Sequence, residues 1–110
     1  MAFHGTVGDW RGIKDIVENG FRIRGGAAAP RHGERFGPGV YCSPDPEVAA
    51  RYAAAQPLPT YDHEMYCVVF QVRVRPGCYS EHWHDDDQCH CWVARDPQDV
   101  RPTGILLRQL

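Results

Sequence analysis

The segment Met65–Val74 constrains the fold most, because its ten residues read as one long β-strand. Six of them are β-branched or aromatic, a composition that favours strands, and Pro76-Gly77 marks the end of the segment. Strands dominate the rest of the chain as well. Shorter ones are expected at residues 2–6, 40–42, 91–94 and 104–107.

Two helices are expected in the first half of the chain. The first spans Asp9–Glu18, where Trp10, Ile13, Ile16 and Val17 form one apolar face and Asn19-Gly20 ends the helix. The second begins at residues 43–47 (Ser-Pro-Asp-Pro-Glu), which combine polar caps, an early proline and acidic side chains near the positive end of the helix dipole. It runs to about Gln56 and stops at the prolines that follow.

The remaining segments are expected to be loops. Residues 25–37 are rich in Gly, Ala and Arg without periodicity, and residues 78–89 form an acidic segment that carries histidines. The sequence contains no internal repeat and no linker. We therefore predict a single α+β domain over residues 1–110, with two small, mainly antiparallel sheets packed face to face and flanked by two short helices.

Charge and cysteine content narrow the classes of protein to which this chain can belong. The 110 residues carry a formal net charge of −2, and the eleven arginines and one lysine form no basic run. This distribution argues against a general nucleic-acid-binding or anionic-membrane-binding surface. Five cysteines at irregular spacing do not match a disulfide framework. We expect reduced thiols and an intracellular protein, cytoplasmic or nuclear.

Two short motifs about thirty residues apart carry a specific resemblance. His4-Gly5-Thr6 ends the first strand, and the stretch 37–41 (Gly-Pro-Gly-Val-Tyr) leads into the second, with Tyr52 eleven residues after Tyr41. Together they resemble the signature of the ADP-ribosyltransferase superfamily, in its poly(ADP-ribose) polymerase-like branch with a diphtheria-toxin-like His-Tyr-Glu triad. The resemblance extends from His4 to Leu107, and it implies an ADP-ribosyltransferase fold and cleavage of NAD.

The resemblance implies roles for these residues in binding NAD. His4 would hydrogen-bond the adenosine ribose, and Gly5, which with Thr6 completes the first motif, would offer backbone groups to the nicotinamide carboxamide. Tyr41 and Tyr52 would cover opposite faces of the nicotinamide ring, and Gly39 belongs to the turn before Tyr41. Two aromatic walls suit a flat cationic ring.

Two further positions follow from the same resemblance. Arg22 lies in the stretch 20–23 (Gly-Phe-Arg-Ile), where the family places an arginine near the adenine; a solvated loop arginine is the alternative. Ala49 stands where family members often carry a serine that binds the carboxamide. We therefore expect weaker NAD binding than in the polymerases.

The third triad position lacks its glutamate. Alignment places Cys91 there, and a shift of one residue would place His90 there instead; only one can point into the site, because neighbouring strand residues face opposite sides. No glutamate follows Glu81 in the chain. Loss of such an electrostatic contact typically lowers the rate by about 10²–10³-fold, which argues against polymer synthesis.

The acidic, histidine-bearing segment allows two other readings. Glu81, Asp85, Asp86 and Asp87 stand where the family has its acceptor-recognition loop, although a solvated charge run would look the same. The segment also gathers six thiol and imidazole side chains that zinc could bind: Cys78, His82, His84, Cys89, His90 and Cys91. Their spacing differs from the usual zinc pattern, so we predict no metal site.

These observations favour an NAD-dependent mono-ADP-ribosyltransferase that acts on a protein or nucleic-acid acceptor, expected to be a monomer. The short segment before His4 leads us to expect that the helical domain preceding the catalytic domain of nuclear polymerases is lacking. One alternative is a module that binds NAD or a protein partner with little or no turnover. Another is an NAD-dependent RNA 2′-phosphotransferase, which also contains His-Gly-Thr but has basic motifs that this sequence lacks.

Overall fold

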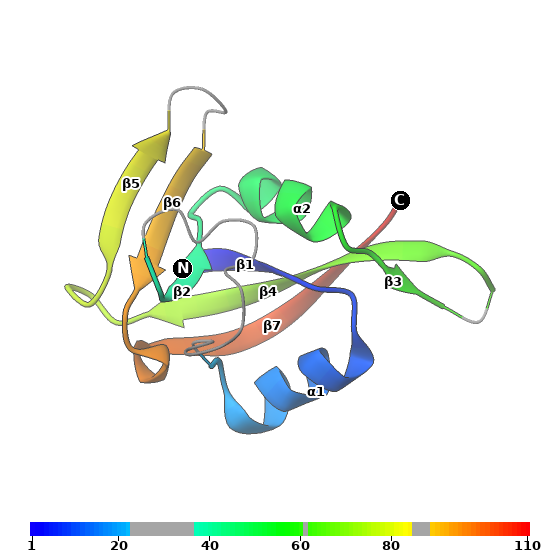
Figure 1. The fold of residues 1–110 in the computed structure, drawn as a ribbon, viewed down its shortest axis with the longest axis horizontal. Helices are drawn as coiled ribbons and strands as arrows, with labels where there is room; N and C mark the ends of the chain where they lie inside the picture. Colours follow the sequence, from blue (N-terminus) through cyan, green and yellow to red (C-terminus); the bar gives the residue numbers. More distant parts are fainter. Residues whose placement is uncertain (23–36, 61, 85–88) are drawn as a thin grey trace.

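The predicted strand Met65–Val74, β4, is the central strand of a four-stranded antiparallel sheet (Figure 1). The structure is a computed structural model that describes residues 1–22, 37–60, 62–84 and 89–110. β1 (Ala2–Thr6) and the two-residue β3 (Leu58–Pro59) pair with one edge of β4, and β7 (Val100–Gln109) pairs with the other. The strands predicted at residues 2–6 and 65–74 are confirmed, whereas β3 was not predicted.

β7 is longer than the strand expected at residues 104–107. It begins at Val100 and continues through Pro102, a residue type that usually interrupts a strand. Gln71 pairs with Gly104 but Val72 pairs with Pro102, so that Thr103 is one residue extra and forms a bulge. A proline donates no ladder hydrogen bond and is tolerated at a bulge or on an edge strand. Pro102 therefore interrupts the sequence pattern of β7 without ending the strand.

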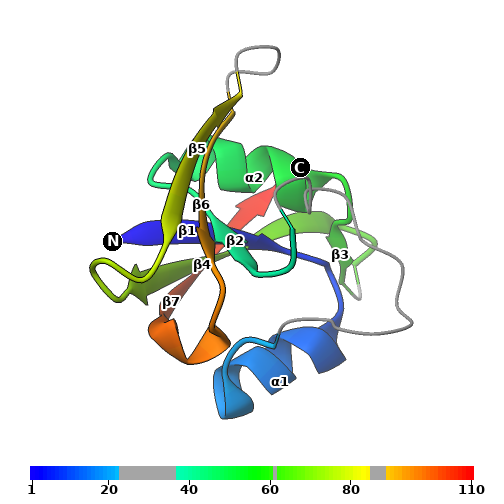
Figure 2. The same cartoon turned by 60° about the vertical axis from the view of Figure 1, so that its left-hand side comes forward.

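A second antiparallel sheet has the order β2-β6-β5 (Figure 2). Its strands are β2 (Val40–Cys42), β5 (Ser80–His84) and β6 (Cys89–Ala94). The prediction of a loop over residues 78–89 is wrong for residues 80–84, which form β5 and pair with β6. Polar residues occupy both faces of β5, so this strand lacks the apolar–polar alternation by which a strand is predicted.

The helix α1 (Trp10–Asn19) covers one face of the first sheet (Figure 1). The Asp9 side chain caps its first turn by accepting from the Arg11 amide, and Gly20 ends it at a φ of 80°. Ile13 is buried, but Trp10 and Val17 are 62% and 57% exposed. These two side chains lie at the rim of the apolar face that the sequence predicts, where the sheet does not reach them.

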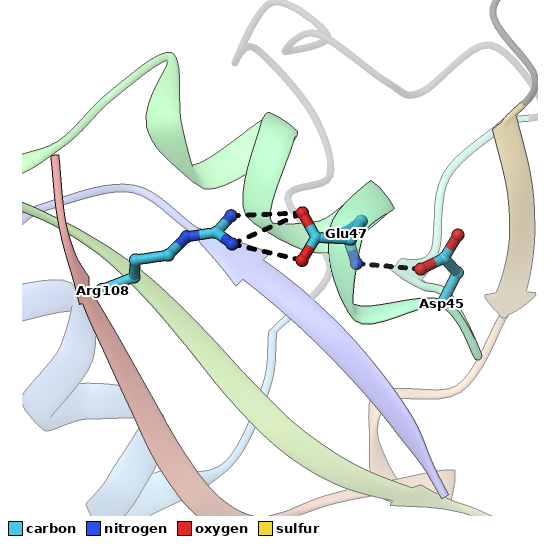
Figure 3. A network of polar contacts seen from close by, with 3 residues as sticks. All are labelled: Asp45, Glu47 and Arg108. Carbon is cyan, nitrogen blue, oxygen red and sulfur yellow. Dashed lines mark hydrogen bonds and ion pairs between the residues drawn. The ribbon is translucent and has the colours of Figure 1, made fainter.

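The helix α2 (Pro46–Ala54) covers the opposite face of the first sheet. Asp45 caps it by accepting a hydrogen bond of 2.9 Å from the Glu47 amide, and Pro46 occupies its first turn. The Glu47 carboxylate also receives the guanidinium of Arg108 from β7, with the Nη1–Oε1 distance at 3.1 Å (Figure 3). The start of α2 is thus held both by its own cap and by the last strand.

Two apolar clusters occupy the two faces of the first sheet. One joins Val68, Phe70 and Val72 of β4 to residues of α1, and the second sheet contributes Val40, Cys42 and Ala94 to the same cluster. The other consists of the small side chains Ala49, Ala50 and Ala53 of α2 with Cys67 and Val69 of β4. Burial on both faces explains why β4 is apolar along most of its length. Among the helices in the described part of the chain, none has the length and apolar character needed to cross a membrane.

Candidate functional site

The two sheets meet where β1 passes the end of β2. The Phe3 amide donates to the Ser43 carbonyl at 2.7 Å, and the Ser43 amide donates back to the Phe3 carbonyl at 2.8 Å. Backbone groups along a strand alternate between its two edges. The N–H and C=O of Gly5 therefore point in the same direction as those of Phe3, away from β4. Beyond Ser43, this edge of β1 presents a donor and an acceptor side by side.

The missing side chain of Gly5 serves the packing of α2. A Cβ at this position would overlap the carbonyl oxygen of Ala49 and would lie 3.1 Å from the amide nitrogen of Ala53. Only a glycine allows α2 to approach β1 this closely. The space that the missing side chain leaves is thus occupied by α2, and Gly5 can offer a ligand only its backbone edge.

His4 connects β1 to β2 through its side chain. The Nδ1 atom lies 2.6 Å from the carbonyl oxygen of Tyr41. Because a carbonyl only accepts, Nδ1 carries the hydrogen of the neutral ring and Nε2 is an acceptor. Phe21 packs edge-on against the imidazole at 4.8 Å between ring centroids. Burial lowers the pKa of His4 and outweighs the opposite effect of the Tyr41 hydrogen bond, so the ring is neutral near pH 7.

Tyr41 closes the turn that precedes it. Its hydroxyl donates to the Gly37 carbonyl at 2.6 Å, and Gly37 has a φ of 94°, which favours glycine. The Arg95 guanidinium donates to the Pro38 carbonyl at 2.6 Å from the other side. A Cβ on Gly39 would lie 2.6 Å from Cγ1 of Val93. The two glycines of the second motif thus shape the turn that presents Tyr41.

One face of the second sheet carries Tyr41 together with several side chains of β5 and β6. Tyr41 is paired with Val93, and Cys91 lies two residues before Val93, on the same face of the strand. His82 is paired with Cys91, and Ser80 with Val93, so both share this face. Cys91 is buried, whereas His82 and Ser80 are partly exposed. We refer to this set as the Tyr41 face.

His90 lies on the opposite face of the second sheet. Its ring stacks on Trp83 at 3.7 Å with an interplanar angle of 13°, and Nε2 lies 2.5 Å from the Glu81 carboxylate. Its carbonyl accepts a hydrogen bond from the buried hydroxyl of Ser43. Of the two residues that the sequence offers for the third triad position, the structure brings Cys91, and not His90, to the side of Tyr41.

The thiols near this site differ in environment. Burial, followed by the proximity of Cys91, raises the pKa of Cys42 to about 12, so this thiol stays protonated at neutral pH. Its Sγ lies 3.8 Å from the Trp92 carbonyl. Within the described ranges, Cys42, Cys67, Cys78 and Cys91 form no disulfide bond. Across those same ranges, no three Cys, His, Asp or Glu residues are grouped so that they could hold a metal ion.

The other predicted site residues lie on β1, on α2 and directly after α1. Thr6 is buried at the end of β1, and Ala49 is buried in α2, where its carbonyl faces Gly5. Tyr52, one turn further along α2, is 41% exposed. Arg22 follows α1 and is held there by Asp15, with Nε 2.9 Å from Oδ2. The hydrogen bond from Arg22 holds the pKa of Asp15 below its ordinary value.

Part of the expected site falls outside the described residues, and part of the observed site was not expected. Asp85, Asp86 and Asp87 of the acidic segment lie outside the described ranges. Ser43, His82 and Ser80 were not predicted as site residues. The two-residue spacing of Ser80 and His82 is the signal that could have placed these two side chains on one face of a strand.

Residues 1–74 match the family model of the poly(ADP-ribose) polymerase catalytic domain. This is more than half of the chain, and the chain therefore belongs to that family of ADP-ribosyltransferase catalytic domains. The matched residues include His4, Gly5, Tyr41 and Tyr52, whereas Cys91 lies beyond them. Neither a curated protein nor a solved structure gives a significant match.

Proposed function

We propose that this domain binds NAD and transfers a single ADP-ribose to a macromolecular acceptor. The observation that carries the proposal is the junction of the two sheets, where His4 bonds the backbone of Tyr41 and the backbone groups of Gly5 point away from β4, along the edge that pairs with Ser43. Membership of the polymerase catalytic family supports ADP-ribosyl transfer as the chemistry. The residues present suit both ends of the NAD molecule.

At the nicotinamide end, an amide finds both partners that it needs. The carboxamide can donate to the Gly5 carbonyl and accept from the Gly5 amide, which fixes the direction of the ring. The aromatic rings of Tyr41 and Tyr52 attract the positive charge that nicotinamide carries until it leaves. At the other end, Nε2 of His4 is an acceptor and suits a ribose hydroxyl.

Transfer of one unit, and not of a polymer, is proposed from the third triad position. Cys91, which the family resemblance assigns to the glutamate position, lies on the Tyr41 face, and no glutamate follows Glu81 in the sequence. In the polymerases this glutamate activates the acceptor sugar for the next transfer. Without it, chain extension is lost and the first transfer slows by about 10²–10³-fold.

The test uses the purified domain with labelled NAD. We expect labelling of an acceptor in cell lysate, release of nicotinamide, and a rise in melting temperature when NAD is added. Tyr41→Ala should abolish that rise, while the matched variant Tyr41→Phe, which keeps the ring, should retain most of it. An unchanged NAD response in Tyr41→Ala would contradict the assignment of the site, and a ladder of polymer products would contradict single transfer.

A second candidate is a module that binds NAD without turnover, and the lack of any glutamate after Glu81 is the observation that favours it. In that case NAD raises the melting temperature but no nicotinamide is released. Nicotinamide release without any labelled acceptor would instead identify an NAD hydrolase. The same set of assays therefore separates the three activities.

A further inference from the structure

His82 lies directly across from Cys91 in the β5–β6 ladder. Side chains of directly opposed residues point to the same face, with Cβ atoms about 4.5–5.5 Å apart. An imidazole and a thiol at this separation come within reach of each other. Both belong to the Tyr41 face, and Cys91 is the diagonal neighbour of Tyr41, which pairs with Val93 two residues further along β6.

The surroundings suit a ring that carries a proton. The hydroxyl of Ser80 lies 2.8 Å from Nε2 of His82 and 3.4 Å from the carbonyl oxygen of Val93. A doubly protonated imidazole donates from Nε2 to the Ser80 oxygen, and the Ser80 hydrogen then points to the Val93 carbonyl. In this series of hydrogen bonds, the Nε2 hydrogen of His82 and the hydroxyl hydrogen of Ser80 each have an acceptor. His82 can therefore gain a proton without leaving either of these groups unsatisfied.

We propose that His82 takes the proton of the Cys91 thiol, so that a thiolate–imidazolium pair supplies negative charge at the third triad position. The S–H bond breaks, an N–H bond forms on the imidazole, and the net charge of the pair does not change. The use of this charge beside the nicotinamide ribose rests on the proposed function. A neutral thiol could not stabilise the positive charge that develops on the ribose when nicotinamide leaves, whereas a thiolate can.

Cys42 provides the contrast within the same sheet. Its thiol is buried without a facing imidazole, since its partner in the ladder is Trp92, and burial keeps it protonated. Thiols in apolar surroundings are inert, and those beside a protonated histidine become thiolates near neutral pH. The groups that face Cys91 from the described parts of β2 and β5 are Tyr41 and His82, with Ser80 adjacent. Among them only His82 can carry a positive charge.

The pair is tested first without NAD. Iodoacetamide alkylation of Cys91 is followed by peptide mass spectrometry over a pH series, with Cys78 as the internal control. We expect the Cys91 midpoint to lie below the ordinary thiol value of about 8.5. His82→Gln should raise that midpoint and slow alkylation at pH 7 by about tenfold, without changing Cys78. A Cys91 midpoint that is ordinary, or that His82→Gln leaves unchanged, overturns the proposal.

A second measurement covers the case in which the buried Cys91 alkylates slowly. Thiolate absorbance in the ultraviolet, recorded on the same pH series, should lose one equivalent at pH 7 in Cys91→Ser. The same equivalent should be lost in His82→Gln. If both variants keep this thiolate absorbance at pH 7, the proposal of a thiolate–imidazolium pair is overturned.

The role of the pair in turnover is then measured as nicotinamide release. We expect His82→Gln and Cys91→Ser each to lower the rate by about 10²-fold while the rise in melting temperature with NAD persists. Cys91→Glu should restore or raise the rate, because it supplies the charge directly. Release that is insensitive to His82→Gln overturns the catalytic role. A wild-type protein that NAD does not stabilise contradicts the proposed function, and the alkylation profile still decides whether the pair exists.

Discussion

At the scale of single residues, His4 couples protonation to stability. Burial lowers its pKa below the ordinary value of 6.5, so the unfolded chain takes up a proton more readily than the folded domain. The stability that the neutral ring provides is therefore complete above about pH 6.5 and declines as the pH falls below it.

Unfolding experiments between pH 7 and pH 5 test this coupling. Because one proton is involved, the free energy of unfolding of the wild type should fall by up to about 1.4 kcal/mol more than that of His4→Gln for each unit by which the pH is lowered. The comparison removes the contribution of the other histidines, which both proteins share. Parallel pH profiles for the two proteins would contradict a neutral His4 whose pKa is lowered by folding.

The strand positions of the two motifs could be predicted from the sequence because each motif is local. His4, Gly5 and Tyr41 lie within short segments whose strand character is itself readable. Their partners could not be predicted in the same way. His82 meets Cys91 only through the register of two paired strands, and neither strand contains a pattern that fixes this register.

At the scale of elements, the contact between β1 and α2 depends on one glycine. Gly5→Ala would place a methyl group against the Ala49 carbonyl, and the helix would have to move away from the strand. We expect a loss of about 1–3 kcal/mol in the free energy of unfolding. We also expect a smaller NAD response, because the shift displaces the edge of β1.

The matched control is Gly12→Ala in α1. A Cβ on Gly12 meets only the Asp9 carboxylate at 4.0 Å, and alanine is the better helix former. The free energy of unfolding of this variant should rise by about 0.5–1 kcal/mol. Urea unfolding of both variants gives the comparison, and losses of equal size at the two glycines would contradict the close packing at Gly5.

The start of α2 gives a second prediction at this scale. Asp45→Ala removes the acceptor for the Glu47 amide and should lower the free energy of unfolding by about 0.5–2 kcal/mol. Asp45→Asn keeps a side-chain oxygen in the same place, so its free energy of unfolding should fall much less. Thermal unfolding measures both, and an equal loss in the two variants would show that the negative charge, and not the cap, stabilises the helix.

Elements with a strong period or composition could be predicted, and the others could not. β4 matches its prediction at both ends, and each helix lies inside or within a residue of its expected range. The strand β5 was missed because its stability comes from pairing with β6 and not from an apolar face of its own. The exposure of Trp10 and Val17 was also unforeseen, since a helical pattern indicates a face but not how far the sheet extends beneath it.

At the scale of the whole molecule, Ser43 holds the two sheets together. Its backbone pairs with Phe3 of the first sheet, and its hydroxyl donates to the carbonyl of His90 at 2.5 Å in the second. The same oxygen accepts from the Asp45 amide at 3.1 Å, ahead of α2. Ser43 is only 2% exposed, so water cannot replace these bonds.

Ser43→Ala should therefore leave the His90 carbonyl and the Asp45 amide without the hydroxyl that bonds both, at a loss of about 1–3 kcal/mol in the free energy of unfolding. Thr103→Ala is the control, because its hydroxyl also donates to a backbone carbonyl, that of Gln71, but is exposed. We expect the free energy of unfolding of the control to change by less than about 0.5 kcal/mol.

The Tyr41 face and the edge of Gly5 lie on different sheets, so a change in how the sheets are joined should also affect NAD binding. Ser43→Ala should therefore weaken the NAD response more than Thr103→Ala does. Equal effects of the two substitutions on urea unfolding and on NAD binding would show that the sheets are held together elsewhere.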